Sequence, residues 1–180
     1  MDRAALRAVA LRVAALALLL LLVLVAVIIA RTLNRVPDAT IHLIRFEEDT
    51  FTLVPVHRRL GTREPAAFAH AAVAALAEGP TASEAEDGLA SAVPEDTRVL
   101  SAELRDGSLT VDLSAEFEDG GGTASMRGRL EQVRWTLSGP SSVTSVRLSL
   151  DGAPLKVLGG EGLLVETSWS RPPSGALPRW

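Results

Sequence analysis

The 180-residue sequence contains no cysteine and no tyrosine. Without cysteine the chain has no disulfide, no thiolate zinc site, no cysteine nucleophile and no lipid-anchoring cysteine of the bacterial lipoprotein type. This absence does not assign a compartment, because many exported bacterial domains lack disulfides. Aromatic residues make up only 4% of the chain, and three of them are tryptophans. We expect Trp135 in the core, whereas Trp169 and Trp180 either dock back on the domain or meet a partner.

Histidine is also scarce, with His42, His57 and His70 as the only examples. Their spacings fit no zinc motif, and the sequence contains no HExxH helix. His57 also precedes Arg58 and Arg59, whose charges disfavour a bound cation. We therefore expect no metal and no cofactor, and we expect histidines that lie on the surface or are half-buried.

Positive charge is in the minority outside the first thirty residues. Three of the 18 basic and one of the 22 acidic side chains lie in residues 1–30, which leaves 15 basic, 21 acidic and a net charge of −6. A domain with this balance and no stripe of Lys and Arg repels the phosphate backbone of nucleic acids. We therefore expect no nucleic-acid partner.

One long apolar run lies near the N-terminus, where residues 13–30 read VAALALLLLLVLVAVIIA. As an α-helix these residues would cover about 27 Å, close to the hydrocarbon thickness of a bilayer. Arg12 can extend its charge to the interface at one end. Because such a helix has no polar face, it fits a membrane span better than a surface helix, and a buried core helix is the remaining alternative.

The run fits a retained signal anchor better than a cleaved signal peptide. Cleaved signals have a shorter apolar core, about 7–15 residues, and small residues just before the cleavage site. Here bulky residues precede Ala30, and an arginine follows at once, as at the far interface of a membrane span. We expect the segment to be retained as a single-pass anchor.

Arginines on the two sides of the run bear on its orientation. Arg3, Arg7 and Arg12 favour an N-terminus in the cytoplasm, and Arg31 and Arg35 weaken that bias. A long domain crosses the membrane largely regardless of its charge. We therefore expect the rest of the chain to lie outside the cytoplasm.

The first half of the remaining chain predicts a hairpin followed by a helix. The β-rich runs at 41–46 and 51–56 flank an acidic turn. Pro65 fits the first turn of a helix that ends near Glu78, because a Gly-Pro pair follows. Residues 81–84 (TASE) have the form of a capping box and predict one more helical turn.

Two Asp-Gly pairs predict further hairpins in the second half. At Asp106-Gly107, apolar and polar residues alternate on both sides, as in two strands joined by a type I′ turn. The apolar face of the first of these strands is expected to consist of Leu100, Ala102 and Leu104. At Asp151-Gly152 residues 146–150 alternate, and residues 155–158 pair back on them. Pro154 places that last strand at an edge or at a strand start.

A second helix is predicted between these hairpins, after the glycine run at 120–122, with Thr123 or Ser125 as its cap. Four apolar residues at helical spacing define its buried stripe: Met126, Leu130, Val133 and Leu137. The charged residues between them are expected to face elsewhere: Arg127, Arg129, Glu131 and Arg134.

The glycine run and two serines are candidates for chemistry, each with a simpler reading. The run at 120–122 lacks the Lys-Ser/Thr and the spacing of a phosphate loop. We expect a flexible loop before a capped helix, with anion binding at that helix N-terminus as the alternative. Ser91 and Ser114 lack the G-x-S-x-G elbow of a nucleophilic serine.

An acidic patch at the end of a predicted strand is the remaining candidate: Asp112, Ser114, Glu116, Glu118 and Asp119. Two carboxylates at a suitable separation are the machinery of glycosidases. Nothing in the sequence distinguishes an acid from a base here, and no aromatic platform for a sugar is near. We expect a solvated strand end and loop, and no enzyme activity.

Short motifs occur in a fixed order along the chain. They are Ala75–Thr81 (ALAEGPT), Gly88–Pro94 (GLASAVP), Val111–Phe117 (VDLSAEF), the glycine run and Gln132–Leu137 (QVRWTL). Each alone is a turn, strand or cap, but the series resembles the GerMN domain family over about residues 40–166. The resemblance implies an extracytoplasmic, non-catalytic α+β module of the kind found in GerM sporulation and spore-germination proteins and in LpqB-type lipoproteins. It implies no catalytic, cofactor-binding or metal-binding residues.

The predicted fold is α+β: one compact domain with an antiparallel or mixed sheet and two helices on one face, in the order ββ-α-ββ-α-ββ, preceded by one transmembrane helix. The predicted boundaries are a cytoplasmic tail at 1–12, a signal-anchor helix at 13–30, a linker at 31–39, a GerMN-like domain at 40–166 and a loose Pro-, Gly- and Ser-rich tail at 167–180.

Two functions are compatible with this organisation, and a third is remote. The first is an envelope module that assembles with itself or with other envelope proteins. The alternative is a module that binds peptidoglycan or another envelope glycan and reports to a partner. The remote third is a hydrolase that uses the acidic patch.

Overall fold

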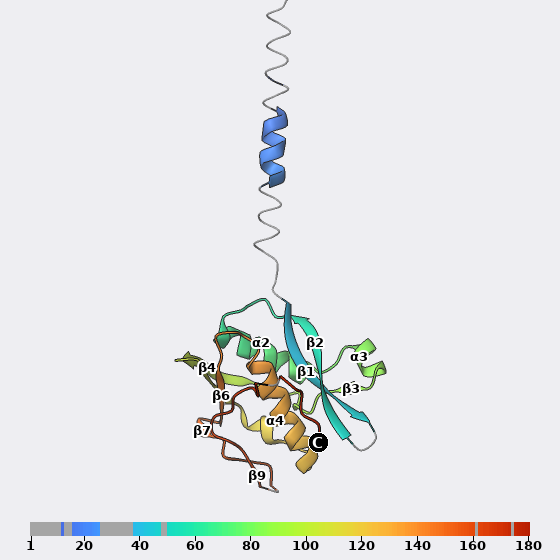
Figure 1. Ribbon diagram of the computed structural model, residues 1–180, viewed down its shortest axis with the longest axis vertical. Helices are drawn as coiled ribbons and strands as arrows, with labels where there is room; N and C mark the ends of the chain where they lie inside the picture. Colours follow the sequence, from blue (N-terminus) through green and yellow to red (C-terminus); the bar gives the residue numbers. More distant parts are fainter. Residues whose placement is uncertain (1–11, 13–15, 26–37, 48–49, 161, 174) are drawn as a thin grey trace, which may run out of the picture. The chain divides into compact units, whose positions relative to one another are not determined.

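The computed structural model describes residues 12, 16–25, 38–47, 50–160, 162–173 and 175–180. The chain divides into two units, Met1–Val36 and Pro37–Trp180, and each is described by itself. In the first unit, residues 16–25 are helical and all their side chains are exposed (Figure 1). Within the described ranges no helix is both long enough and apolar enough to cross a bilayer. The expected span at 13–30 continues on both sides into residues outside those ranges.

The second unit begins with the predicted hairpin. Strands β1 (Asp38–Glu47) and β2 (Thr50–Arg59) pair antiparallel, and β1 starts two residues before the expected domain boundary at 40. The short strand β3 (Leu89–Ala90), which the sequence pattern did not predict, pairs with the other edge of β1. The alternating residues of β1 supply fully buried side chains, including Ile41 and Leu43.

The first predicted helix is confirmed as α2 (Pro65–Glu78), with Pro65 in its first turn and Gly79 after its last. Its N-terminal amides at Ala66 and Ala67 donate to the Glu64 carboxylate. The predicted capping box is also present and starts the short helix α3 (Ala82–Glu86).

A second sheet contains β4 (Val99–Arg105), β5 (Ser108–Leu113), β6 (Ser145–Leu150) and β7 (Ala153–Pro154), in that order. The β4–β5 hairpin turns at Asp106 and Gly107 with φ of 48° and 79°, the left-handed pair of a type I′ turn. The alternation of residues also did not predict the pairing of β5 with β6, which is parallel. The prediction that residues 155–158 pair back on β6 is wrong, because the returning strand is the shorter β7 at 153–154, and residues 157–158 pair with 163–164 instead. Strand β7 contains Pro154 and lies at the edge of the sheet.

The predicted apolar face of β4 is wrong at one position. A β-bulge between Val99 and Ser101 shifts the register against β5. The bulge turns Leu100 outward, where it is 52% exposed, and leaves the half-buried Val99 facing the core instead. The alternating apolar residues of β4 therefore do not all lie on one face of the strand.

The second predicted helix is α4 (Thr123–Leu137), which follows the 3₁₀ turn η1 (Ala115–Glu118). The predicted cap, Thr123 or Ser125, is wrong, because the N-cap is Gly122, which has no side chain to accept from the first-turn amides. The whole predicted apolar stripe of α4 is buried. Parallel strands need a crossover connection, and α4 is the crossover between β5 and β6.

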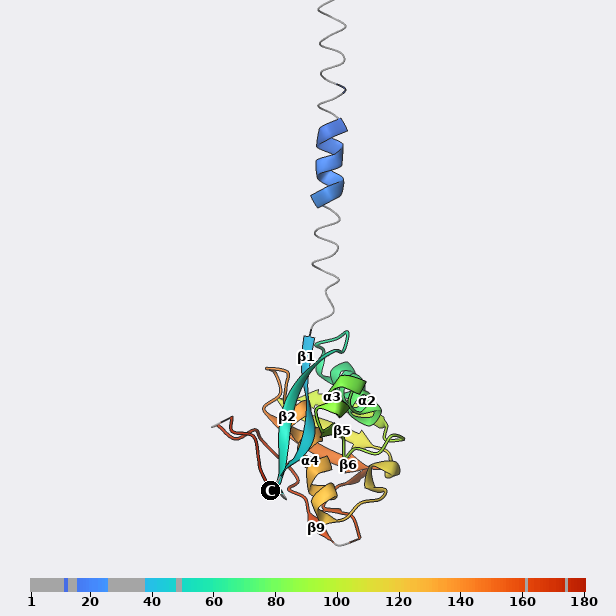
Figure 2. The ribbon, with the colours of Figure 1, turned by 90° about the vertical axis from the view of Figure 1, so that its right-hand side faces the viewer.

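The compact α+β fold is confirmed, but the expected single sheet is not. The strands form two main sheets and the small pair β8 (Val157–Leu158) and β9 (Leu163–Leu164). Strand β1 is the central strand of the first sheet, between β2 and β3, and no strand pairing among the described residues joins this sheet to the second. Helix α4 packs on β1 and α2 packs on β4, so the two helices connect the sheets (Figures 1 and 2).

The C-terminal tail docks on the domain, so the expectation of a loose tail is wrong. Trp169 forms an isolated antiparallel β-bridge with Val146 of the second sheet, and Arg179 forms one with Thr52 of the first. The Trp180 ring stacks on Phe51 at a centroid distance of 6.1 Å. Of the two roles left open for the tail tryptophans, docking on their own domain is the one observed.

Candidate functional site

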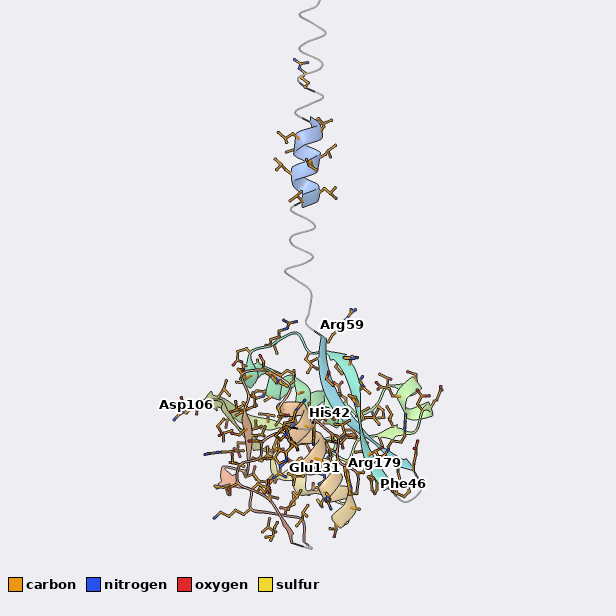
Figure 3. The ribbon with its side chains drawn as sticks, in the orientation of Figure 1. His42, Phe46, Arg59, Asp106, Glu131 and Arg179 are labelled. Atoms are coloured by element: carbon orange, nitrogen blue, oxygen red, sulfur yellow. The ribbon has the colours of Figure 1, made fainter. Side chains whose placement is uncertain are left out.

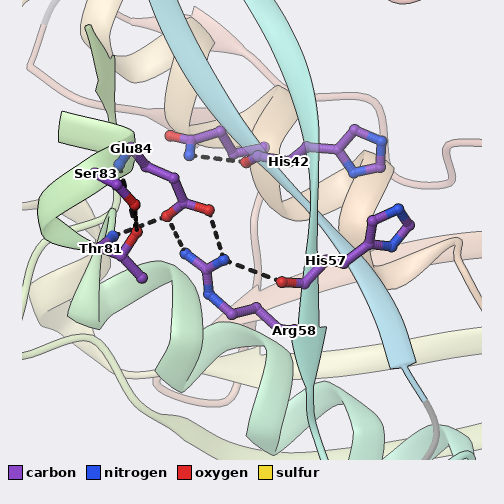
Figure 4. Close-up of polar contacts among 7 residues, drawn as sticks. His42, His57, Arg58, Thr81, Ser83 and Glu84 are labelled. Atoms are coloured by element: carbon purple, nitrogen blue, oxygen red, sulfur yellow. Dashed lines mark hydrogen bonds and ion pairs between the residues drawn. The ribbon is translucent and has the colours of Figure 1, made fainter. Parts of the chain in front are cut away.

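The capping-box motif after α2 is tied to the hairpin by an ion pair. The Arg58 guanidinium donates to both carboxylate oxygens of Glu84 at 2.7 and 2.5 Å, while Glu84 also accepts from the Thr81 amide (Figure 4). The hydrogen bond with Arg58 lowers the pKa of Glu84 to about 2. The motif is therefore a structural clamp between β2 and α3.

The prediction that Arg129 faces away from the core is wrong. Its side chain is only 3% exposed, and its guanidinium donates to the carbonyl oxygens of four residues: Ala92, Phe117, Asp119 and Gly120. Burial lowers the pKa of Arg129, and the nearby Asp119 and Glu118 act in the opposite direction. Arg129 therefore holds two loops against α4, including the first glycine of the run.

Arg134 is also buried, contrary to the prediction, whereas the exposed Arg127 agrees with it. The Arg134 guanidinium lies 5.9 Å from the Trp169 ring centroid and donates to the Glu166 carbonyl. Glu131, half-buried on the same helix, lies 3.7 Å from Arg134 and is labelled in Figure 3. This group fixes the start of the tail.

Two further polar residues of α4 hold β1 and the loop after β3. The Gln132 amide donates to the His42 carbonyl at 2.9 Å and accepts from the Ala92 amide at 2.7 Å. The Thr136 hydroxyl accepts from the His42 amide at 3.0 Å and lies 3.4 Å from His42 Nδ1. Ser91, once a candidate nucleophile, contacts Gln132 and the Val93 amide. The QVRWTL and GLASAVP motifs therefore encode one buried polar network.

The acidic patch is used for loop structure. Asp112 accepts from the Gly152 amide with both oxygens, at 2.9 and 3.1 Å, and Glu118 accepts from the Gly159 amide at 2.7 Å. A hydrogen bond with Ser114 lowers the pKa of the half-buried Glu116. Asp112 and Glu118 are thus bound to backbone amides on two separate turns.

The three histidines differ in burial. His57 and His70 are exposed, as expected, but His42 is only 4% exposed. Burial, and then the charge of Arg171, lower the pKa of His42 to about 4, so the imidazole is neutral near pH 7. No group of three or more metal-ligating side chains occurs among the residues with described positions.

A cleft of about 680 Å³ opens beside His42. Its apolar walls come from Phe68 and Trp135, and the tail contributes Leu177. Hydroxyl-bearing side chains also line it: Thr40, Thr62, Ser141 and Ser142. This volume lies within the usual range for small-molecule sites, about 300–1,000 Å³.

Two arginines give the cleft its charge. Arg63 is exposed at its rim, and Arg171 lies with its guanidinium 4.9 Å from the Trp135 ring centroid. Arg171 Nε donates to the Ser138 hydroxyl and Nη2 to the Trp135 carbonyl. No aspartate or glutamate lines the cleft among the residues that the structure describes. The cleft is therefore positive although the domain as a whole is acidic.

Sequence reasoning missed this cleft. Arg171 and Leu177 belong to a tail whose composition predicted no docking, and Thr62 and Arg63 lie in a short loop before α2. The sequence offered one signal for a docked tail. Trp169 lies in the tail, and its large apolar ring can pack edge-on against a core tryptophan such as Trp135. The structure places these two ring centroids 5.8 Å apart.

Solved structures with a similar fold come from two bacteria. The tandem GerMN domains of the sporulation protein GerM from Bacillus subtilis match with 26% identity and a TM-score of 0.59, over 75% of this chain and 44% of that one. The first GerMN domain alone matches with 23% identity and a TM-score of 0.60, over 75% and 98% of the two chains. A Clostridium perfringens protein named as a lipoprotein shares the fold at 19% identity and a TM-score of 0.50, over 75% and 87%.

The present chain thus spans less than half the length of the tandem-domain structure. Among curated proteins, none matches this sequence. The family model named Germane, described as sporulation and spore germination, matches residues 41–156. The chain therefore belongs to the Germane family and contains one GerMN-type domain, as its motifs predicted.

Proposed function

We propose that this protein is a single-pass membrane protein whose Germane domain lies outside the cytoplasm and acts as a non-enzymatic assembly module of the bacterial cell envelope. The observation that carries the proposal is the uninterrupted apolar run at 13–30, directly before a domain of the GerM type. A run of 18 or more apolar residues is the usual signature of a membrane helix. The lipoprotein name of one structural relative is compatible with an anchored domain.

The described part of the run supports an anchor. In the helix at 16–25 the leucines and valines are 42–63% exposed, and no polar side chain interrupts them. Such a surface is stable where lipid covers it and unfavourable in water. A protein of this kind also needs no catalytic pair, in keeping with the structural use of Asp112 and Glu118.

Intact mass and protease accessibility test the anchor and its orientation together. A retained anchor predicts that protein extracted from membranes has the full mass of 19.0 kDa. An extracytoplasmic domain predicts that protease added outside intact protoplasts removes a C-terminal tag. A smaller mass, or a tag protected until the cells are lysed, would contradict the proposal.

Assembly with itself or with other envelope proteins requires a separate test. Lys156 is the only lysine, so amine-reactive crosslinkers have little to act on. A photo-crosslinking amino acid at exposed apolar positions is better suited, and Leu164 (81% exposed) and Phe46 (56% exposed) are suitable sites. We expect discrete crosslinked species in living cells from at least one site. Recovery of uncrosslinked monomer alone from both sites and from a matched set of exposed polar positions would count against assembly.

A second candidate function, binding of peptidoglycan or another envelope glycan, is favoured by the cleft beside His42. Its aromatic walls and hydroxyl groups are the features that sugar sites use. The test is co-sedimentation of the detergent-solubilised protein with purified sacculi. Absence from the pellet at low and at moderate salt would exclude this function.

A further inference from the structure

We propose that the cleft formed by β1, the end of α4 and the C-terminal tail binds an anionic polyol, meaning a sugar or glycerol unit that carries a carboxylate or phosphate group. The inference deepens the second candidate function, because it names the ligand chemistry of the cleft. It does not depend on the membrane anchor or on assembly.

The first step is the charge of the lining. Arg63 and Arg171 line the cleft without a carboxylate among the described lining residues, in a chain whose remainder beyond residue 30 carries a net charge of −6. The carboxylate that follows Arg63 in the sequence, that of Glu64, accepts hydrogen bonds from the Ala66 and Ala67 amides at the start of α2. A local positive site on an acidic surface favours an anion at that place alone.

The second step is the free hydrogen-bonding capacity of Arg171. Its Nε and Nη2 atoms are used by Ser138 and Trp135, and these bonds fix the plane of the guanidinium beside the Trp135 ring. Nη1 has no partner among the described residues. A guanidinium held in position loses little conformational entropy on binding a carboxylate or phosphate oxygen.

The third step is His42. Its ring Nδ1 lies 3.4 Å from the Thr136 hydroxyl, and either atom can be the donor of that contact. The other ring nitrogen, Nε2, has no hydrogen-bond partner among the described residues. His42 lines the cleft, so a neutral imidazole nitrogen that can donate or accept is available to a ligand there.

The remaining lining selects a polyol over a bare ion. Thr40, Ser141 and Ser142 offer hydroxyl groups that both donate and accept, whereas Phe68 and Trp135 offer apolar surface for the C–H face of a sugar ring. A cleft of about 680 Å³ is far larger than phosphate requires and has the size of small-molecule sites.

The test uses pairs of probes that differ only in the acidic group. Binding to the full chain in neutral detergent micelles is measured calorimetrically and by NMR at the Trp135 indole. N-acetylmuramic acid is compared with N-acetylglucosamine, and glycerol 3-phosphate with glycerol. Each probe is titrated to about 10 mM, which detects dissociation constants in the millimolar range. The two acidic probes distinguish a carboxylate source from a phosphate source.

Arg63→Gln is the informative variant, because Arg63 is exposed and makes no hydrogen bond or ion pair with the described residues. Arg147→Gln is its matched control, since Arg147 is also an exposed arginine and lies on β6 outside the cleft. We expect the acidic member of at least one pair to bind, its neutral counterpart not to bind, and Arg63→Gln to weaken binding about three- to tenfold while Arg147→Gln leaves it unchanged.

Three results would overturn the inference: no binding of either acidic probe, equal binding of a neutral counterpart, or equal affinities of the two variants. Failure here is distinguishable from failure of the second candidate function. If acidic probes bind the cleft and sacculi do not retain the protein, the ligand chemistry stands and the cell-wall role is excluded. If sacculi retain the protein and Arg63→Gln has no effect, another surface binds the wall.

Discussion

Helices α2 and α4 have nearly equal lengths, 14 and 15 residues, but they bury different kinds of side chain. Every buried residue of α2 is apolar, and half of them are alanines. Helix α4 buries its apolar stripe and, in addition, Arg129, Gln132, Arg134 and Thr136. The difference teaches that α2 stabilises the domain by close packing, whereas α4 holds distant loops in place through its polar side chains.

The largest effect is expected at the centre of the polar network. Arg129→Met keeps a long side chain but leaves four carbonyl oxygens without their donor. Since each unsatisfied buried group costs about 1–3 kcal/mol, and part of that cost is relieved by water, we expect a loss of about 4 kcal/mol in the free energy of unfolding. Urea unfolding measures it, and hydrogen exchange should rise first around Gly120.

Arg127→Met is the matched control for this prediction. Arg127 lies two positions away on the exposed face of α4. Its replacement should change stability by less than about 0.5 kcal/mol. Equal losses for the two variants would show that the network does not stabilise α4 in the way described.

Leu76→Ala in α2 should cost slightly less, about 3 kcal/mol, because Leu76 is fully buried and its truncation leaves a cavity. Leu76→Met nearly conserves volume and should cost less than about 1.5 kcal/mol. Unfolding in urea compares the three proteins. A loss for Leu76→Met as large as for Leu76→Ala would contradict simple packing as the role of α2.

His42, which α4 holds through Thr136, should make stability depend on pH. Its pKa is lowered from 6.5 to about 4 in the folded protein, so the unfolded state binds the proton more readily. The contribution is fully present above pH 6.5 and is lost as the pH falls toward 4, by about 3 kcal/mol in all. Thermal unfolding across this range should show the loss in wild type and in the His70→Gln control, but not in His42→Gln. A pH profile unaffected by His42→Gln would exclude this account.

The smallest effect is expected at the clamp between β2 and α3. Glu84→Gln removes the charge that pairs with Arg58 and should cost about 1–2 kcal/mol. Because the folded pKa of Glu84 is lowered from 4.5 to about 2, its contribution is present above pH 4.5 and is lost as the pH falls toward 2. Unfolding measured below pH 4 should therefore bring wild type and Glu84→Gln together. A constant difference down to pH 2 would show that the charge is not the cause.

Local signals predicted much of the fold. Alternating residues and Asp-Gly at 106–107 specified a hairpin, and Pro65 with Gly79 specified the ends of α2, because these effects act within a few residues. The buried Arg129 was missed because its acceptors lie in two loops up to 37 positions away. A charged residue between apolar ones looks solvated until the loops that cover it are placed.

The tail and the cleft were missed for the same reason. The Pro- and Gly-rich composition of residues 167–180 says that no helix forms, but it does not say whether Trp169 and Arg171 find contacts. The parallel pairing of β5 with β6 likewise depends on how α4 packs, not on either strand. Features that depend on contacts between three or more distant segments could thus not be predicted from the sequence pattern.

The central claim, that the apolar run holds an exported Germane domain at the membrane, is tested most directly by paired reporters after Trp180. Alkaline phosphatase, which is active only outside the cytoplasm, and a fluorescent protein that matures only inside it are each joined through a flexible linker. The account predicts active phosphatase and no fluorescence, with the activity in the membrane fraction. Bright fluorescence with inactive phosphatase would contradict it.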